Sequence, residues 1–161
     1  MAAIISDCGL YRYRLERDGV GTGCTAVIMV NPSTADAEND DATIRKLIGF
    51  GQRNKWGKIV VGNLFAYRAT DVRELALADD PVGPLNDAHL TEMMLEANQL
   101  FFAWGSLAKQ PKHHRGRWRR VADLAKLARI GPMCLATTKD GHPGHPLMLG
   151  YSNQPQHWTK P

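Results

Sequence analysis

Short apolar runs alternate with segments of helical periodicity along most of the chain. The apolar runs are continuous and rich in β-branched or aromatic residues, which is typical of strands covered on both faces. Between them, apolar residues recur three and four positions apart, which predicts amphipathic helices. We expect strands at 25–30 (TAVIMV), 58–65 (KIVVGNLF), 99–105 (QLFFAWG) and 132–137 (PMCLAT), and helices at 41–54, 86–98 and 117–129.

This alternation predicts an α/β protein: a three-layer α/β/α sandwich with a mainly parallel, four-stranded central sheet. Before it, the segment LYRYRLERDG (10–19) alternates with period two, which predicts a half-exposed edge strand or a hairpin that turns in DGVGTG (18–23). We expect a single domain over 1–161, with the N-terminal strand or hairpin at 1–23, the α/β core at 24–140 and an irregular segment at 141–161.

The loops that follow the predicted strands carry most of the candidate chemistry. In a parallel sheet these loops meet at one edge, where ligands of open α/β sheets bind. Each polar residue also has a structural interpretation, such as helix capping by Asn31 or Ser33 or a core position for Trp104. Their convergence on one edge nevertheless favours a binding site. The residues are Asn31, Pro32, Ser33, Asp36, Asp41, Asn63, Tyr67, Arg68, Trp104, Ser106, His142 and His145.

The positive charge is concentrated in the last third of the chain. The net charge is +4, but from Lys109 onward 10 Lys and Arg residues stand against two acidic ones. The segment KQPKHHRGRWRR (109–120) is the densest part. Phosphate contact and a solvated helix entrance are both open interpretations, and the first predicts a nucleic-acid partner. The candidate DNA-binding residues are Lys109, Lys112, Arg115, Arg117, Arg119 and Arg120.

Motifs for metals, cofactors and membranes are missing from the sequence. It contains no CxxC or HExxH pattern and no Walker lysine loop, and no apolar run approaches the roughly 20 residues of a membrane helix. The three cysteines are odd in number and far apart, which indicates reduced, buried thiols. We therefore expect a cytoplasmic protein with no cofactor, no metal and no membrane partner.

Four short motifs resemble those of the uracil-DNA glycosylase superfamily, in the same order. MVNPS (29–33) resembles the first motif, although Met29 replaces its opening glycine and Ser33 its usual aromatic residue or glycine. GNLFAYRAT (62–70) resembles the strand that ends in a base-pairing asparagine. FAWGSLAKQ (102–110) resembles the Leu-Leu-Trp-Gly-Ser motif, and GHPGHPLML (141–149) the His-Pro-Ser-Pro-Leu motif.

Nearly the whole chain also resembles a family of uncharacterised bacterial and phage proteins, defined only as a domain of unknown function. The shared segments are NPSTAD, Asp-x-Thr-Ile-Arg, NLFAYRATD, DPVGPLND and a His-Pro-Leu ending. This second resemblance is the more specific one, but it implies no activity.

The glycosylase resemblance implies an enzyme that hydrolyses the N-glycosidic bond of a plain or modified base in DNA. Asn31 would orient water, and Asp36 or Asp41 would act as the base or stabilise the cationic sugar. His142 or His145 would donate to the leaving base, and His145 is preferred because it belongs to the shared His-Pro-Leu segment. Asn63 would pair with the base edge. The expected substrate-binding residues are Pro32, Ser33, Asn63, Tyr67, Arg68, Trp104 and Ser106.

Two other functions remain open from the sequence. The first is an enzyme that acts on free nucleotides or nucleosides. The second is a non-catalytic protein that binds nucleic acid and shares the glycosylase fold. DNA affinity without an abasic product would favour the binding protein, and cleavage of nucleosides without DNA affinity would favour the small-molecule enzyme.

Overall fold

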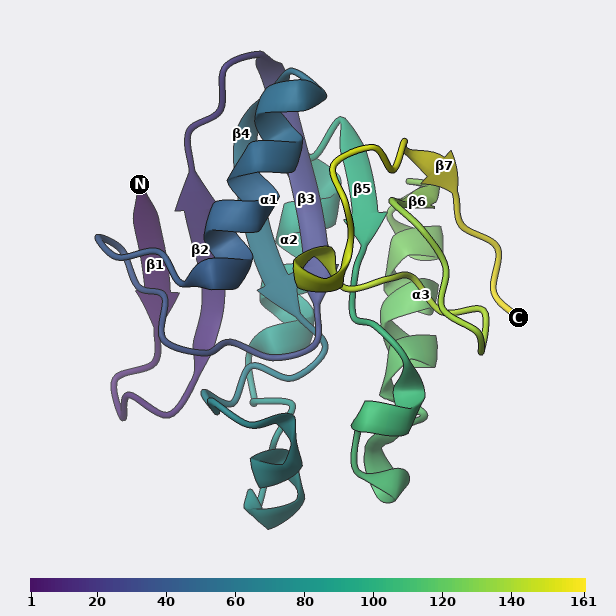
Figure 1. Ribbon diagram of the computed structural model, residues 1–161. Coiled ribbons are helices and arrows are strands. Elements are labelled where there is room, and N and C mark those ends of the chain that lie inside the picture. Colours follow the sequence, from purple (N-terminus) through teal and green to yellow (C-terminus); the bar gives the residue numbers. More distant parts are fainter.

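The computed structural model describes residues 1–161 and contains one mixed, seven-stranded sheet with helices on both faces (Figure 1). The strand order is β1-β2-β4-β3-β5-β6-β7. β3, β4, β5 and β6 are parallel to one another, whereas β1, β2 and β7 join antiparallel. The strands are β1 Ala2–Ile5, β2 Arg12–Arg17, β3 Thr22–Met29, β4 Trp56–Asn63, β5 Gln99–Phe102, β6 Pro132–Cys134 and β7 Gln156–His157.

The four predicted core strands are neighbours in this sheet, which confirms the α/β class. The sheet has seven strands, however, and not four. β2 is not an edge strand, because β1 pairs with one side of it and β4 with the other. The glycine cluster at 18–23 therefore leads past β4 to β3 and does not close a hairpin. At the other end, β7 pairs with β6 within a segment that the sequence predicts to be irregular.

Helices cover both faces of the sheet, which explains why the strands are apolar without interruption. α1 (Ala42–Arg53) covers one face, where its Leu47 belongs to the same buried cluster as Val27 of β3. α2 (Asn86–Glu96) and α3 (Arg117–Leu127) cover the other face, where Leu90 contributes to the same cluster as Ile28. Adjacent strand residues point to opposite faces, and helices cover both faces, so Val27 and Ile28 are both fully buried. No helix combines the length and the apolar character needed to cross a lipid bilayer.

The three cysteines are free thiols in different surroundings. Cys134 on β6 is buried, and burial raises the pKa of its thiol. Cys24 on β3 is half-buried and Cys8 is exposed in the β1–β2 connection. The sequence prediction of buried thiols is therefore correct for Cys134 and wrong for Cys8, which lies in a surface turn.

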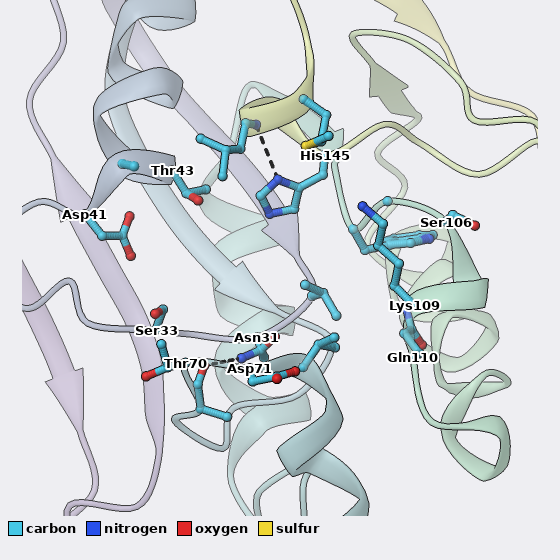
Figure 2. A pocket seen from close by; sticks show the side chains of 18 residues that line it. Asn31, Ser33, Asp41, Thr43, Thr70, Asp71, Ser106, Lys109, Gln110 and His145 are labelled. Atoms are coloured by element: carbon cyan, nitrogen blue, oxygen red, sulfur yellow. Dashed lines mark hydrogen bonds between the residues drawn. The ribbon is translucent and has the colours of Figure 1, made fainter.

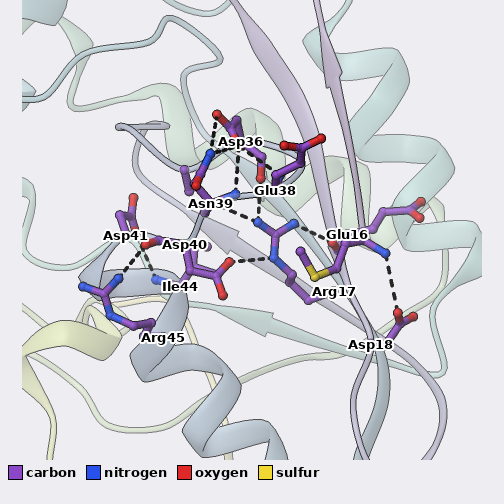
Figure 3. Close-up of polar contacts among 12 residues, drawn as sticks. Glu16, Arg17, Asp18, Asp36, Glu38, Asn39, Asp40, Asp41, Ile44 and Arg45 are labelled. Carbon is purple, nitrogen blue, oxygen red and sulfur yellow. Dashed lines mark hydrogen bonds and ion pairs between the residues drawn. The ribbon is translucent and has the colours of Figure 1, made fainter.

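The buried guanidinium of Arg17 holds the loop between β3 and α1 (Figure 3). It donates to the carbonyl oxygens of Asp36 and Asn39 at 2.5 and 3.3 Å. Its Nε donates to the carboxylate of Asp40 at 2.7 Å. From the same strand, Arg12 donates to the carbonyl of Ala35 at 2.6 Å. These bonds fix the backbone of a loop that has no regular secondary structure.

Two further acids of this loop, Asp36 and Asp41, accept hydrogen bonds from backbone N–H groups. Asp36 Oδ1 accepts from the N–H groups of Glu38 and Asn39, each at 2.9 Å, and these bonds lower the pKa of Asp36. Asp41 caps α1, since its Oδ1 accepts from the Ile44 N–H at 2.9 Å (Figure 3). Three of the four acidic residues in this loop therefore form an ion pair (Asp40), a turn (Asp36) and a helix cap (Asp41).

Replacing Arg17 with Met is expected to destabilise the protein by about 2–4 kcal/mol, because the acceptors of the loop lose a charged donor. Arg45 is a matched control, since it is exposed and also donates to this loop, at the Asp40 carbonyl. Arg45→Met should change stability by no more than about 0.5 kcal/mol. Urea unfolding measures both. Equal effects of the two substitutions would show that Arg17 has no special role.

Candidate functional site

A cavity of about 580 Å³ lies where the loops following β3, β4 and β5 meet the His-Pro loop near the C-terminus (Figure 2). It is therefore at the carboxyl edge of the parallel strands, the usual ligand position in open α/β sheets. Its lining comes from residues within 30–33, 41–43, 69–72, 104–110 and 145–148.

Asn31 presents its amide oxygen to this cavity. Its Nδ2 donates to the Ala69 carbonyl at 2.8 Å and to the Pro32 carbonyl at 3.1 Å (Figure 2). The Ala69 N–H in turn donates to the Pro32 carbonyl at 3.0 Å, which ties the loop after β3 to the loop after β4. With both amide hydrogens engaged, Oδ1 is left as an acceptor for a ligand or for water.

A second acceptor lies beside the N-terminus of α1. Asp41 uses Oδ1 as the helix cap, which leaves Oδ2 without a protein partner. Thr43 and Ser33 line the same side of the cavity and add hydroxyl groups (Figure 2). This side of the cavity is therefore rich in oxygen atoms that accept hydrogen bonds.

His145 lies across the cavity from these acceptors (Figure 2). Its Nδ1 accepts from the Leu147 N–H at 3.3 Å and caps a short 3-10 turn, Pro146–Met148. Burial, aided by the nearby charge of Lys109, lowers the pKa of His145 to about 4. The ring is thus neutral at pH 7. Since Nδ1 accepts, the proton lies on Nε2, which points into the cavity as a donor.

The loop after β5 forms the wall next to His145. Gly105 has a φ of 80° and lies so close to His145 that a Cβ there would be 3.3 Å from the histidine Cβ. The Gly105 N–H donates to the Pro143 carbonyl at 2.8 Å, and Ser106 Oγ donates to Asp140 at 3.0 Å. Glycine at this position therefore allows the two loops to pack together and to hold the histidine in place.

His142 does not line this cavity. It is buried among Trp104, Trp118 and Trp158, and its Nδ1 accepts from Trp104 Nε1 at 3.2 Å. Burial lowers the pKa of His142, although Asp140 opposes the shift. Of the two histidines that the sequence offers, the structure thus places His145 in the cavity and His142 in the core beside α3.

Other predicted site residues lie outside the cavity lining. Asn63 is buried at the end of β4, and neither polar atom of its side chain has a hydrogen-bond partner. Tyr67 packs edge-on against Tyr11, and Arg68 Nη1 donates to the Gly9 carbonyl at 3.4 Å. Pro32 is buried outside the lining, and the Asp36 carboxylate accepts from the backbone N–H groups of its own turn. The cavity therefore gathers Asn31, Ser33, Asp41, Trp104, Ser106 and His145 from the predicted catalytic and substrate-binding residues, and Lys109 from the predicted DNA-binding residues.

The cations of the basic segment fall into two groups, those with a hydrogen-bonded protein partner and those without one. Arg115 donates to the carbonyls of Gln110 and Ala108, each at 3.0 Å. Arg117 donates to the Leu64 carbonyl and pairs with Asp87 at 2.6 Å, and Arg120 joins the same carboxylate at 3.1 Å. Structural partners thus occupy these three guanidinium groups. Arg120 is exposed as well, and the exposed cations without a hydrogen-bonded protein partner are Lys109, which lines the cavity, Lys112, and Arg119, which lies over the Trp118 ring.

Several lining residues are missing from the predicted site, although Thr70 and Asp71 belong to the segment NLFAYRATD (63–71) and Gln110 to FAWGSLAKQ (102–110). Thr70, Asp71 and Val72 come from a segment between β4 and α2 without strong periodicity. Gln110 lies within the basic segment, where the surrounding cations dominate the pattern. The positions of these residues in the sequence do not predict that they lie at the carboxyl edge of the sheet, beside the cavity. The structure contains no cluster of three or more His, Cys, Asp or Glu side chains that could hold a metal ion.

Comparison with known proteins gives a family but no activity. Residues 12–147 match the family described as "Protein of unknown function (DUF1643)", so the chain belongs to that family. The match covers every residue that lines the cavity except Met148. No curated protein and no solved structure matches the chain.

The His145 ring is expected to titrate near pH 4 and not near its ordinary value of 6.5. Since the unfolded chain binds this proton near pH 6.5, the His145 contribution to the free energy of unfolding should decrease as the pH falls from 6.5 to 4. NMR of the histidine ring protons measures the midpoint, and a His145→Asn variant identifies the resonance. A midpoint at or above pH 6 would contradict the neutral ring described above.

Proposed function

We propose that this member of the DUF1643 family hydrolyses the N-glycosidic bond of a base in DNA. The observation that supports this function best is that hydrogen-bond acceptors and a hydrogen-bond donor face each other across one cavity. A free amide oxygen of Asn31 and the Asp41 carboxylate lie on one side, and the Nε2 donor of His145 lies on the other.

The chemistry needs groups of these two kinds. Water adds to C1′ of the sugar while the C1′–N bond breaks and its electron pair leaves on the base. Positive charge develops on the sugar and negative charge on the base. Asn31 Oδ1 holds the water by accepting a hydrogen bond from it, and Asp41 stabilises the cationic sugar and takes the proton that the water loses. Asp41 then returns this proton to solvent, and the base anion takes one proton from solvent, which balances the reaction.

A neutral histidine suits the leaving-group side. A donor aimed at a base oxygen stabilises negative charge as it develops, without a prior proton transfer. His145 supplies that donor from Nε2 while its Nδ1 is held by the Leu147 N–H. Because the pKa of His145 is about 4, this state persists throughout the neutral range.

Size and sequence motifs support the same function. A volume of about 580 Å³ lies within the range typical of small-molecule sites and can hold a base with its sugar. All four segments that resemble uracil-DNA glycosylase motifs contribute residues to the cavity lining. Asn63, which would pair with the base in that resemblance, lies outside this lining, so the support comes from the other residues of the four segments.

A second candidate is the hydrolysis of free nucleotides or nucleosides. The inward orientation of Arg115 and Arg117 favours it, because fewer cations remain on the surface for a phosphate backbone. The exposed Lys109 and Lys112 beside the cavity favour DNA. The two candidates share the cavity and the reaction and differ only in whether a polymer is bound.

Asn31→Ala and His145→Asn should each lower the rate of base release by about 100-fold with little change in DNA affinity, as for groups that act in the transition state. Asparagine at 145 can still cap the 3-10 turn, as histidine does, but has no donor at the Nε2 position. Mass spectrometry of bases released from plain and modified DNA gives the rates.

Thr34→Ala is the matched control for these variants, because Thr34 lies in the same loop as Asn31 but is exposed and outside the cavity. It should leave the rate unchanged. Full activity in both Asn31→Ala and His145→Asn would exclude the proposed mechanism. Release of bases from nucleosides alone would select the second candidate.

Replacing Lys109 and Lys112 together with Ala should weaken binding to single-stranded DNA. The slope of log affinity against log salt should decrease by about 1.4, because two fewer counterion-releasing contacts form. Fluorescence anisotropy at several salt concentrations measures this slope.

The control for the lysine variant removes the same charge elsewhere. Lys55 and Lys126 are both exposed. Lys55 directly precedes β4, and Lys126 lies in the last turn of α3, so both are at the opposite edge of the sheet from the cavity. The Lys55→Ala, Lys126→Ala double variant should retain the wild-type slope. If both double variants behave alike, only the total charge matters and the exposed lysines beside the cavity make no specific contact.

A further inference from the structure

Gln110 is a buried polar residue with no partner in the wall of the cavity. It follows the 3-10 turn Leu107–Lys109 and is only 3% exposed. Neither Nε2 nor Oε1 of its side chain makes a hydrogen bond. It also lines an adjoining cavity of about 500 Å³, and the two cavities share four lining residues: Asp71, Val72, Lys109 and Gln110. Gln110 therefore stands where the two spaces meet.

The fold gives no reason for an amide at this position. The Gln110 backbone is already satisfied, since its N–H donates to the Leu107 carbonyl at 3.0 Å and its carbonyl accepts from Arg115 Nε at 3.0 Å. Burying an amide without a partner costs free energy, and an apolar side chain of similar volume would avoid that cost. A ligand that pairs with the amide would offset it.

We propose that Gln110 determines which base the cavity accepts, by pairing with a carbonyl and an adjacent ring N–H of a pyrimidine-dione such as thymine or uracil. This assignment rests on the proposed function. The Gln110 Oε1 would accept from the ring N–H, and Nε2 would donate to a neighbouring carbonyl. The amide is thus a specificity group that touches the base and takes no part in bond cleavage.

The neighbouring groups favour a dione over other bases. A dione edge presents one donor between two acceptors. The wall that carries Gln110 also carries the Lys109 ammonium and the His145 Nε2–H, which are both donors and suit the carbonyl oxygens (Figure 2). Gln110 Oε1 is the acceptor on this wall that suits the ring N–H. The acceptor-rich side around Asn31 and Asp41 is left for water and sugar.

The test compares the binding of thymine and 3-methylthymine, which have no glycosidic bond and differ in the ring N–H. Wild-type protein should bind thymine about tenfold more tightly, the value of one well-placed hydrogen bond. Gln110→Met, which keeps the volume and removes the amide, should bind the two bases equally. NMR titration measures the affinities, and Gln154→Met, at an exposed position remote from the cavity lining, is the matched control.

Thermal unfolding separates recognition from a structural role. Gln110→Met should unfold at the same temperature as the free wild-type protein or at a higher one, because it removes an unpartnered buried amide. A clear decrease in the unfolding temperature would assign Gln110 to the fold and overturn the proposal.

The remaining outcomes also decide the proposal. If wild-type protein binds both bases equally or binds neither, or if Gln110→Met still prefers thymine, the proposal is overturned even where base release from DNA is observed. If wild-type protein prefers thymine and Gln110→Met does not, the proposal holds even where no DNA releases a base, and only the proposed reaction fails. The two conclusions can therefore fail separately.

Discussion

Arg12 and Arg17 lie almost wholly buried beneath the loop between β3 and α1, and their N–H groups need acceptors that solvent does not supply there. The carbonyls of this loop and the Asp40 carboxylate accept from Nη1 of Arg12 and from Nε and Nη2 of Arg17, whereas Nε of Arg12 has no partner. Burial lowers the pKa of Arg12 to about 10, which is still far above neutral pH. The guanidinium therefore stays charged, and its N–H groups still need hydrogen-bond acceptors. Two residues of one strand thus set the path of the chain up to Asp41 and the start of α1.

Backbone hydrogen bonds also hold together the loops that line the cavity. The bond between Ala69 and Pro32 joins the loops after β4 and β3, and the bond between Gly105 and Pro143 joins the loop after β5 to the His-Pro loop. Structural partners use one end of the Asn31 amide and one end of the His145 ring, so the opposite ends are oriented in advance. This preorganisation gives the cavity an acceptor side and a donor side, the division that a reaction separating charge between sugar and base requires.

Much of this arrangement follows from the sequence, because strands covered on both faces must be apolar throughout and the loops after parallel strands must meet. The sequence does not predict the hydrogen-bond partners of the buried Arg12 and Arg17. In β2 their alternation with apolar residues suggests a solvent face, whereas their partners lie about twenty residues away in a loop without periodicity. Arg117 likewise looks free in a basic segment until α2 brings Asp87 to it. His142 and His145 share one motif, and only tertiary packing sends the first to the tryptophans and the second to the cavity.

The proposed function requires that nucleic acid meets the protein at this one cavity. Backbone amide chemical shifts of the ¹⁵N-labelled protein, recorded while short single-stranded DNA is added, test this directly. We expect shifts that cluster in 31–33, 41–43, 104–110 and 145–148, while the opposite edge of the sheet around 19–22 and 55–57 stays unchanged. Shifts confined to that opposite edge, or none at all, would contradict the account.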